Sequence, residues 1–319
     1  MAFPNGRGGG CISEPCLPVY NVSAAWSGPA RSAAGPGAVE VAMSPGVAAG
    51  LSGMDVIYDG IRFGESVRWH DGRPWFADWA AGQVVSVQGS GQGTIEAAVE
   101  SFPLCFDFLP DGRLVMASSN DRALLRREMD GSVVMIADLA QVGTKPWNEV
   151  VVDDRGNIYV NTTGFDFPEA EFAPGSVALV TPDGNVTEVA ADLAFPNGMA
   201  ITPDGGTLIV AESYAERLTA YSIDPDGTLS QRRVWADTPD EHPDGICLDA
   251  DGAIWFADVG NQHCRRVREG GAVLATVDFD RGAFSCAVGD GRLYVVGQDW
   301  GNDPTGSAPS GVLASFPIA

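Results

Sequence analysis

The chain has 319 residues, a formal net charge of −23, 45% hydrophobic residues, 40 glycines and 21 prolines. Nucleic acids and anionic membranes require a basic face on a protein partner. Because the chain is so acidic, both are excluded as partners. The glycines and prolines predict many turns and short strands rather than long helices. With no apolar run long enough to cross a bilayer and no signal-peptide pattern, the sequence predicts a soluble cytoplasmic protein.

Residues 1–53 differ from the rest of the chain. They are rich in Gly, Ala, Pro and Ser and have no sustained hydrophobic period. Such a segment cannot bury enough apolar surface to offset the entropy that is lost when it is ordered. We expect a disordered extension here and a folded domain over residues 54–319. The six cysteines show neither zinc-ligand spacing nor a dense disulfide framework, so reduced thiols are expected.

A repeated unit runs through the folded part: a short strand, a turn usually built on Asp-Gly, a strongly apolar second strand and a third strand. The copies lie 40, 43, 49, 47 and 41 residues apart, which is the length of a four-stranded propeller blade. The sequence therefore predicts an all-β, six-bladed β-propeller with four-stranded blades around a central channel. A strand near residues 55–58 is expected to close it by joining the last blade. The six copies begin at Glu65, Cys105, Asn148, Asn197, Asp244 and Ser285.

The first strand of each blade lines the channel, so these six residues are expected to form a ring at its upper mouth. Four of them offer oxygen ligands: Glu65, Asn148, Asn197 and Asp244. Asn-Gly and Asp-Gly are also ordinary turn pairs, but four such residues at equivalent repeat positions favour a metal site. Two carboxylates and two amide carbonyls form a hard, oxygen-only set that suits Ca²⁺, with Zn²⁺, Mg²⁺ and Mn²⁺ as alternatives.

Three segments carry a resemblance to a known family: FPNGMAITPDGGTLIVAES, HPDGICLDADGAIWFAD and FGESVRWHDGRPWFADW. They resemble the signature segments of the gluconolactonase and regucalcin (senescence marker protein) family, over residues 58–316. The resemblance implies a six-bladed propeller with a divalent metal, usually Ca²⁺, in its channel, and hydrolysis of lactones. Paraoxonases and diisopropylfluorophosphatase are similar in architecture. By position, the family's metal ligands fall on Glu65, Asn148, Asn197 and Asp244, and its reactive carboxylate falls on Asp244.

The resemblance is weaker on the substrate side. Sugar-lactone hydrolases of the family have an arginine two positions before the third-blade asparagine, where this chain has Pro146. A gluconolactone-like substrate is therefore not expected. Two loops that overhang the mouth, residues 162–175 and 297–306, supply an aromatic rim that favours an apolar lactone, an ester or an organophosphate. The residues assigned to substrate binding are Cys105, Trp147, Phe165, Phe167, Ser285 and Trp300.

The expected reaction is metal-assisted hydrolysis of a small-molecule substrate, in which the cation polarises the carbonyl and stabilises the oxyanion. Asp244 is assigned as the carboxylate that activates water or attacks directly, with Glu65 assisting as a ligand. The alternatives are hydrolysis of organophosphates or aryl esters at the same site, or a propeller that binds calcium without catalysis. A Ser-His-Asp hydrolase is excluded, because the Gly-x-Ser-x-Gly elbow and the α/β alternation are missing. Nothing in the sequence bears on the oligomeric state.

Several other polar residues lie near the mouth. Asp78, Glu212 and Asp258 end second strands, where we expect them to accept hydrogen bonds from turn amides. His263, beside a third strand, is expected to be exposed. For His242 two interpretations stay open: a proton shuttle at the channel mouth, or a loop residue without a role.

Overall fold

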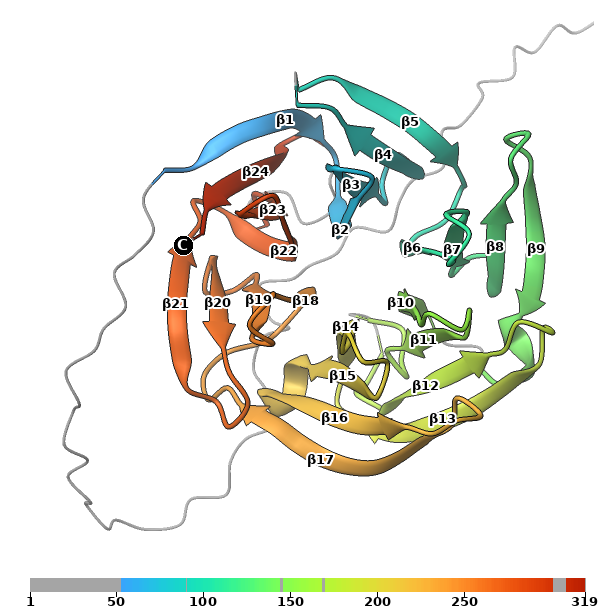
Figure 1. Ribbon diagram of the computed structural model, residues 1–319. Coiled ribbons are helices and arrows are strands. Elements are labelled where there is room, and N and C mark those ends of the chain that lie inside the picture. Colours follow the sequence, from blue (N-terminus) through green and yellow to red (C-terminus); the bar gives the residue numbers. More distant parts are fainter. Residues whose placement is uncertain (1–52, 90, 144–145, 168–169, 301–307, 319) are drawn as a thin grey trace, which may run out of the picture.

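The computed structural model describes residues 53–89, 91–143, 146–167, 170–300 and 308–318. Within them the chain forms six four-stranded antiparallel sheets arranged around a central axis (Figure 1). This arrangement confirms the predicted six-bladed propeller. The extension predicted over residues 1–53 lies outside the described residues, apart from Gly53.

Each blade places one strand in each of four layers around the axis (Figure 1). The innermost strands are β2 (Gly64–His70), β6 (Leu104–Phe108), β10 (Trp147–Val152), β14 (Pro196–Ile201), β18 (Ile246–Leu248) and β22 (Gly282–Gly289). The second strands are β3 (Arg73–Asp78), β7 (Leu114–Ser118), β11 (Ile158–Thr162), β15 (Thr207–Glu212), β19 (Ile254–Asp258) and β23 (Arg292–Gln298). The third strands are β4 (Gln83–Val87), β8 (Ala123–Arg127), β12 (Gly175–Val180), β16 (Arg217–Ile223), β20 (His263–Val267) and β24 (Gly311–Pro317).

The outermost strands are β1 (Asp55–Ile61), β5 (Gly93–Ala98), β9 (Val133–Asp138), β13 (Val186–Leu193), β17 (Leu229–Asp237) and β21 (Val273–Asp278). Two short 3₁₀ helices, η2 (Leu139–Gln141) and η3 (Ser213–Ala215), complete the elements of the described residues.

The propeller is closed by its first strand. β1 pairs antiparallel with β24, so that the last sheet has the order β1-β24-β23-β22. An ion pair between Arg292 of β23 and Asp55 of β1 spans β24, which lies between these two strands. The first strand of the domain and its last three strands therefore share one blade, as the sequence predicts.

The hydrophobic core lies between neighbouring blades. Leu124 and Val160 belong to one buried cluster between the second and third blades, and Ile209 and Phe256 to another between the fourth and fifth. Each blade needs apolar residues on both faces for this packing, which explains the nearly continuous apolar runs of the second strands. Because the core is filled between blades, the upper ends of the inner strands are left to polar residues.

The four described cysteines, Cys105, Cys247, Cys264 and Cys286, carry free thiols, as predicted. In the described part of the chain, no helix is long and apolar enough to cross a membrane.

Candidate active site

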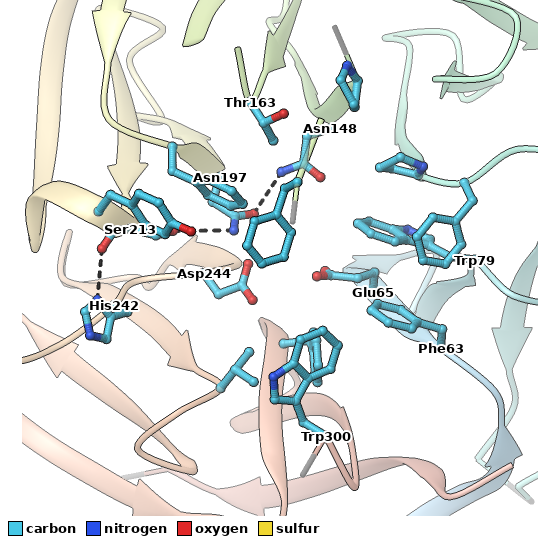
Figure 2. A pocket seen from close by; sticks show the side chains of 18 residues that line it. Phe63, Glu65, Trp79, Asn148, Thr163, Asn197, Ser213, His242, Asp244 and Trp300 are labelled. Atoms are coloured by element: carbon cyan, nitrogen blue, oxygen red, sulfur yellow. Dashed lines mark hydrogen bonds between the residues drawn. The ribbon is translucent and has the colours of Figure 1, made fainter. Parts of the chain in front are cut away.

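Four polar side chains meet at the upper end of the channel. Glu65, Asn148 and Asn197 are each the second residue of an inner strand, and Asp244 lies two residues before β18. All four line one cavity of about 190 Å³. The carboxylates of Glu65 and Asp244 point toward one another across it, and Nδ2 of Asn148 donates to Oδ1 of Asn197 at 3.1 Å (Figure 2). We call these four the ring residues.

Extra residues in the inner strands aim three of these side chains into the cavity. Glu65 of β2 pairs with Ala77 of β3, and Arg68 pairs with Trp75. β2 therefore advances three residues over a stretch in which β3 advances two. The same irregularity occurs at the start of β10 and β14. A β-bulge of this kind breaks the strict alternation of side chains and redirects them, and bulges are common beside active sites.

The pairing of the second blade is regular, and its predicted ring member is not at the cavity. Cys105 pairs directly with Ala117, with no irregularity between β6 and β7. Its side chain is buried in the core between the second and third blades and does not line the cavity. The prediction of Cys105 as a substrate contact is therefore corrected, because no bulge turns it toward the axis.

Two glycines let the inner strands of neighbouring blades approach closely. A Cβ on Gly198 would lie 2.5 Å from the carbonyl oxygen of Asp244, and one on Gly245 would lie 2.6 Å from Cα of Ser285. The amide of Gly198 donates to Asp244 at 3.0 Å, and that of Gly245 donates to Phe284 at 2.9 Å. Neither glycine has a positive φ. Close approach between blades, rather than a tight turn, therefore requires glycine here.

Gly245→Ala should lower the free energy of unfolding by about 1–3 kcal/mol, because the new methyl group meets backbone atoms that cannot move aside. The matched control is Gly260→Ala in the same blade, where a Cβ would make only an ordinary contact at 3.7 Å with Asp258. Urea denaturation of both variants measures the difference, and equal losses would contradict the close-approach explanation.

Burial raises the pKa of both carboxylates of the ring. Desolvation is the largest cause for Glu65, followed by the negative charges of Asp244 and Glu149. Desolvation also comes first for Asp244, followed by the charges of Asp258 and Glu149, while a hydrogen bond with Asn197 lowers its pKa. The cluster therefore resists full ionisation until a cation joins it.

The donor set fits a divalent cation. Oδ1 of Asp244 is buried and has no hydrogen-bond partner among the described residues, which is costly unless a ligand pairs with it. Asn148 uses its nitrogen toward Asn197, so its carbonyl oxygen remains available as a ligand. Carboxylate and amide oxygens are the ligands that Ca²⁺ prefers.

A third carboxylate beside the ring escaped the sequence prediction. Glu149 is 3% exposed, and its Oε1 accepts hydrogen bonds from Nη2 of Arg68 at 2.8 Å and from the hydroxyl of Ser66 at 3.3 Å. Arg68 also lies 3.8 Å from Asp107. Burial lowers the pKa of Arg68, but Glu149 and Asp107 together hold it above its usual range. A buried guanidinium thus balances part of the negative charge next to the ring.

The carboxylates that end second strands fix the segments that lead into the ring. Asp78 accepts the amide of Phe63 at 3.0 Å, Glu212 accepts that of Ala194 at 2.8 Å, and Asp258 accepts two loop amides. The prediction that these residues accept hydrogen bonds from turn amides is confirmed.

A buried ion-pair cluster anchors the loop that leads into β18. His263 Nε2 lies 2.6 Å from Glu241 Oε2, and Arg265 pairs with the other oxygen of Glu241 at 2.6 Å. Asp258, Glu241 and His263 lie close enough together that they could hold a metal ion. Arg265 already supplies the positive charge, however, so we interpret this cluster as structural. The prediction of an exposed His263 is wrong, because its ring pairs with Glu241 at 7% exposure.

The predicted substrate contacts divide into two groups. Phe167 and Trp300 line the cavity, and their contact with a substrate stays a prediction. Trp147 is fully buried between the second and third blades, and Phe165 is 4% exposed beneath the rim. The hydroxyl of Ser285 accepts the amide of Val67 at 2.9 Å and so joins the last blade to the first. Trp147, Phe165 and Ser285 are therefore not among the residues that line the cavity.

Several residues that do line the cavity were missed, and a simple signal could have found some of them. The residue two positions before each ring residue faces the cavity: Phe63 and Phe195, which the prediction missed, and Pro146 and His242, which it named. Residues two apart on an extended strand share a face, so this position follows from each ring residue. His242 Nδ1 lies 3.1 Å from the carbonyl oxygen of Ser213. The two atoms form a hydrogen bond only in the tautomer that carries a proton on Nδ1.

The comparisons with known proteins can now be set beside this geometry. The family model described as SMP-30/gluconolactonase/LRE-like region matches residues 63–297. The chain belongs to this family. A pentonolactonase from Haloferax volcanii is 27% identical over 208 residues, which cover 63% of this chain and 68% of that protein. Diisopropyl-fluorophosphatase from Loligo vulgaris is 28% identical over 155 residues, covering 44% of this chain and 49% of that enzyme.

Solved structures of this family share the fold. A gluconolactonase from Xanthomonas campestris superposes with a TM-score of 0.68 at 24% identity, covering 83% of this chain and 89% of that one. A regucalcin from Agrobacterium tumefaciens, described as a calcium-binding protein, gives a TM-score of 0.70 at 24% identity, covering 84% and 94%. At this level of identity the likeness bears on the fold alone.

Proposed function

We propose that the protein is a metal-dependent hydrolase that opens lactones less polar than sugar lactones. The convergence of Glu65, Asn148, Asn197 and Asp244 in one cavity, with a buried and unpaired oxygen on Asp244, carries this proposal. Ca²⁺ is the favoured ion on the chemistry of the donors, with Zn²⁺, Mg²⁺ and Mn²⁺ as alternatives. Membership of the family, and relatives named pentonolactonase and gluconolactonase, support the reaction class.

A divalent cation held by the ring residues would polarise the lactone carbonyl and stabilise the negative charge that develops on its oxygen. Asp244 takes a proton from the attacking water or attacks the carbonyl carbon itself. If Asp244 acts as the base, the acyl C–O bond breaks, the ring oxygen takes up the proton that Asp244 received from water, and the product is a hydroxy acid. If Asp244 attacks directly, the ring opens to an acyl-enzyme anhydride with a proton from solvent on the ring oxygen, and water then hydrolyses the anhydride to the same hydroxy acid and free Asp244. Glu65 supplies the second negative charge, while Asn148 and Asn197 fix the geometry without adding charge.

The polar groups of the cavity argue for a substrate with few hydroxyl groups. The hydroxyl of Ser213 donates to the carbonyl of Pro243 at 2.7 Å, and that of Thr163 donates to Phe165 at 2.9 Å. Pro146 occupies the position where sugar-lactone hydrolases carry arginine. A sugar lactone would bury hydroxyl groups that find few partners, which costs free energy for each of them.

A second candidate is hydrolysis of organophosphates or aryl esters at the same ring residues. The similarity to a diisopropyl-fluorophosphatase and the aromatic cavity favour it. A propeller that binds calcium without turnover is the non-enzymatic alternative. One experiment separates the three.

Metal removal should abolish hydrolysis, and Ca²⁺ should restore it. The protein is dialysed against a chelator and assayed on γ- and δ-lactones, an aryl ester and a phosphotriester, with and without each of the four cations. We expect the highest kcat/KM on an apolar lactone with Ca²⁺. A phosphotriester that is preferred to every lactone supports the second candidate instead. Absence of turnover on every compound in every metal state would overturn the enzyme proposal.

Calcium binding should also release protons. Because the pKa values of Glu65 and Asp244 lie above their ordinary values of 4.5 and 3.8, the folded, metal-free protein holds protons that the unfolded chain releases above these values. Its free energy of unfolding therefore falls as the pH rises through the folded-state pKa values, and bound cation reverses this loss. Titration calorimetry in buffers of different ionisation enthalpy measures the release, and the increase in Tm caused by Ca²⁺ should grow with pH.

A further inference from the structure

The cavity has a first aromatic wall that is built around Phe63. Phe63 stacks on Trp79 with ring centroids 5.3 Å apart and nearly parallel planes, and contacts Phe102 edge to face at 5.2 Å. Phe284 and Trp300 pack against it at 5.3 and 5.9 Å, also edge to face. All five side chains line the cavity. Each is held by at least one other ring, so this wall presents fixed aromatic surface rather than mobile side chains.

A second aromatic wall comes from the third and fourth blades. Phe195 and Tyr214 stack at 4.7 Å, and Phe167 meets Phe195 edge to face at 5.2 Å. These three side chains also line the cavity. Both walls border the same cavity as the ring residues. Figure 2 shows Phe63 and Trp79 beside Glu65, Trp300 below the two carboxylates, and Ser213 and His242 beside Asp244.

The charge of the cavity is one-sided. Its lining includes two carboxylates, Glu65 and Asp244, and no lysine or arginine among the described residues. Arg68, the nearest buried cation described above, is committed to Glu149 at 2.8 Å. A ligand that carries its own negative charge would therefore find no lysine or arginine among the described lining residues, whereas an uncharged ring would find aromatic surface.

We propose that the substrate is an uncharged lactone or ester whose reacting carbonyl is attached to a planar aromatic group, and that Trp300 is a specificity-determining residue that contacts this group. The reaction in this inference rests on the proposed function, and the recognition of an aromatic group rests on the two aromatic walls.

Three lactones that share a five-membered lactone ring test this proposal: γ-butyrolactone, phthalide and phthalide-5-carboxylate. Each kcat/KM is divided by the rate constant of alkaline hydrolysis of the same compound, which removes intrinsic reactivity. Phthalide should then exceed γ-butyrolactone by about tenfold or more, the value of one good aromatic contact. Phthalide-5-carboxylate should lose on the order of tenfold against phthalide, because its charge is unpaired.

Trp300→Leu should raise KM for phthalide by about tenfold through loss of the aromatic contact, and should raise KM for γ-butyrolactone, which has no aromatic group, by a smaller factor. Phe172→Leu is the control: it also replaces an aromatic side chain with leucine, at a position that is 52% exposed and does not line the cavity. Equal effects of the two variants, or a normalised preference for γ-butyrolactone, would overturn the assignment.

A binding measurement separates this inference from the proposed reaction. Phthalane has the fused ring of phthalide but no carbonyl group, so it reports ring recognition without hydrolysis. We expect it to quench tryptophan fluorescence of the wild type and to bind Trp300→Leu about tenfold more weakly. Phthalane binding without turnover of any lactone would refute the proposed function and keep the recognition; turnover of lactones without phthalane binding would do the reverse.

Discussion

Asp244→Asn should lower kcat/KM for lactone hydrolysis by about 10³-fold, because an amide can neither accept the proton of water nor attack a carbonyl. Asparagine has nearly the same size and keeps one oxygen, so the loop that leads into β18 should hold its position. Loss of one of two ring charges weakens metal binding as well. The loss of activity is measured by assaying the variant across a Ca²⁺ titration, and the loss of metal affinity by determining Kd for Ca²⁺ calorimetrically.

The control variant is Asp251→Asn, in a turn of the same blade, where the carboxylate is 80% exposed. It should match the wild type in activity and in metal affinity. If Asp244→Asn recovers full activity once Ca²⁺ saturates it, Asp244 is only a ligand and the reactive carboxylate has been misassigned. If activity stays low at saturation, the chemical role is supported.

The fold could be predicted because each blade repeats the same local sequence pattern of strand, turn and apolar second strand. An Asp-Gly turn between a polar-ended strand and an apolar one occurs in five of the six repeats. The strongly apolar second strands, such as β7 with all five residues buried, are what packing between blades requires. Even the closing strand was visible, because Asp55–Ile61 has a strand pattern but no partner of its own in the first repeat.

The ring was predictable only in part, because alignment of repeats assumes that equivalent positions point the same way. They do so at Glu65, Asn148 and Asn197, where a bulge redirects the side chain. The second blade has no bulge between β6 and β7, so Cys105 at the equivalent position enters the core. Bulges depend on pairing between strands, which a single sequence does not reveal.

For the same reason, the sequence did not reveal the position of Glu149 beside the ring or the burial of Trp147. Strict alternation places neighbours of Asn148 on the opposite face, yet the irregularity between Trp147 and Val150 leaves Glu149 facing Arg68 and Ser66. A charged residue inside a strand of hydrophobic neighbours was the available signal. Its partner lies 81 residues away in another blade, so the pair becomes visible only when the channel is assembled.

Arg68→Met should lower the free energy of unfolding of the metal-free protein by about 3–5 kcal/mol, because it leaves Glu149 buried without its counter-charge. Methionine retains most of the apolar stem, so the loss reports charge rather than volume. The double variant Arg68→Met/Glu149→Gln removes both charges and should recover most of the stability. Urea denaturation of the wild type, both single variants and the double variant forms a cycle that isolates the coupling. Arg113→Met, at a surface ion pair with Asp111, is the control and should change little.

The pair also connects stability to the metal site. Arg68 lowers the pKa of Glu65 through its charge, against the larger effect of burial. Without the guanidinium, Glu65 keeps its proton to higher pH, so Ca²⁺ must compete with that proton over a wider range. The pH at which Ca²⁺ binds half-maximally should therefore rise in Arg68→Met, whereas loss of Glu149 alone should lower it, because the Glu149 charge raises the pKa of both Glu65 and Asp244. Shifts in the same direction for the two single variants would contradict an electrostatic link between this pair and the ring.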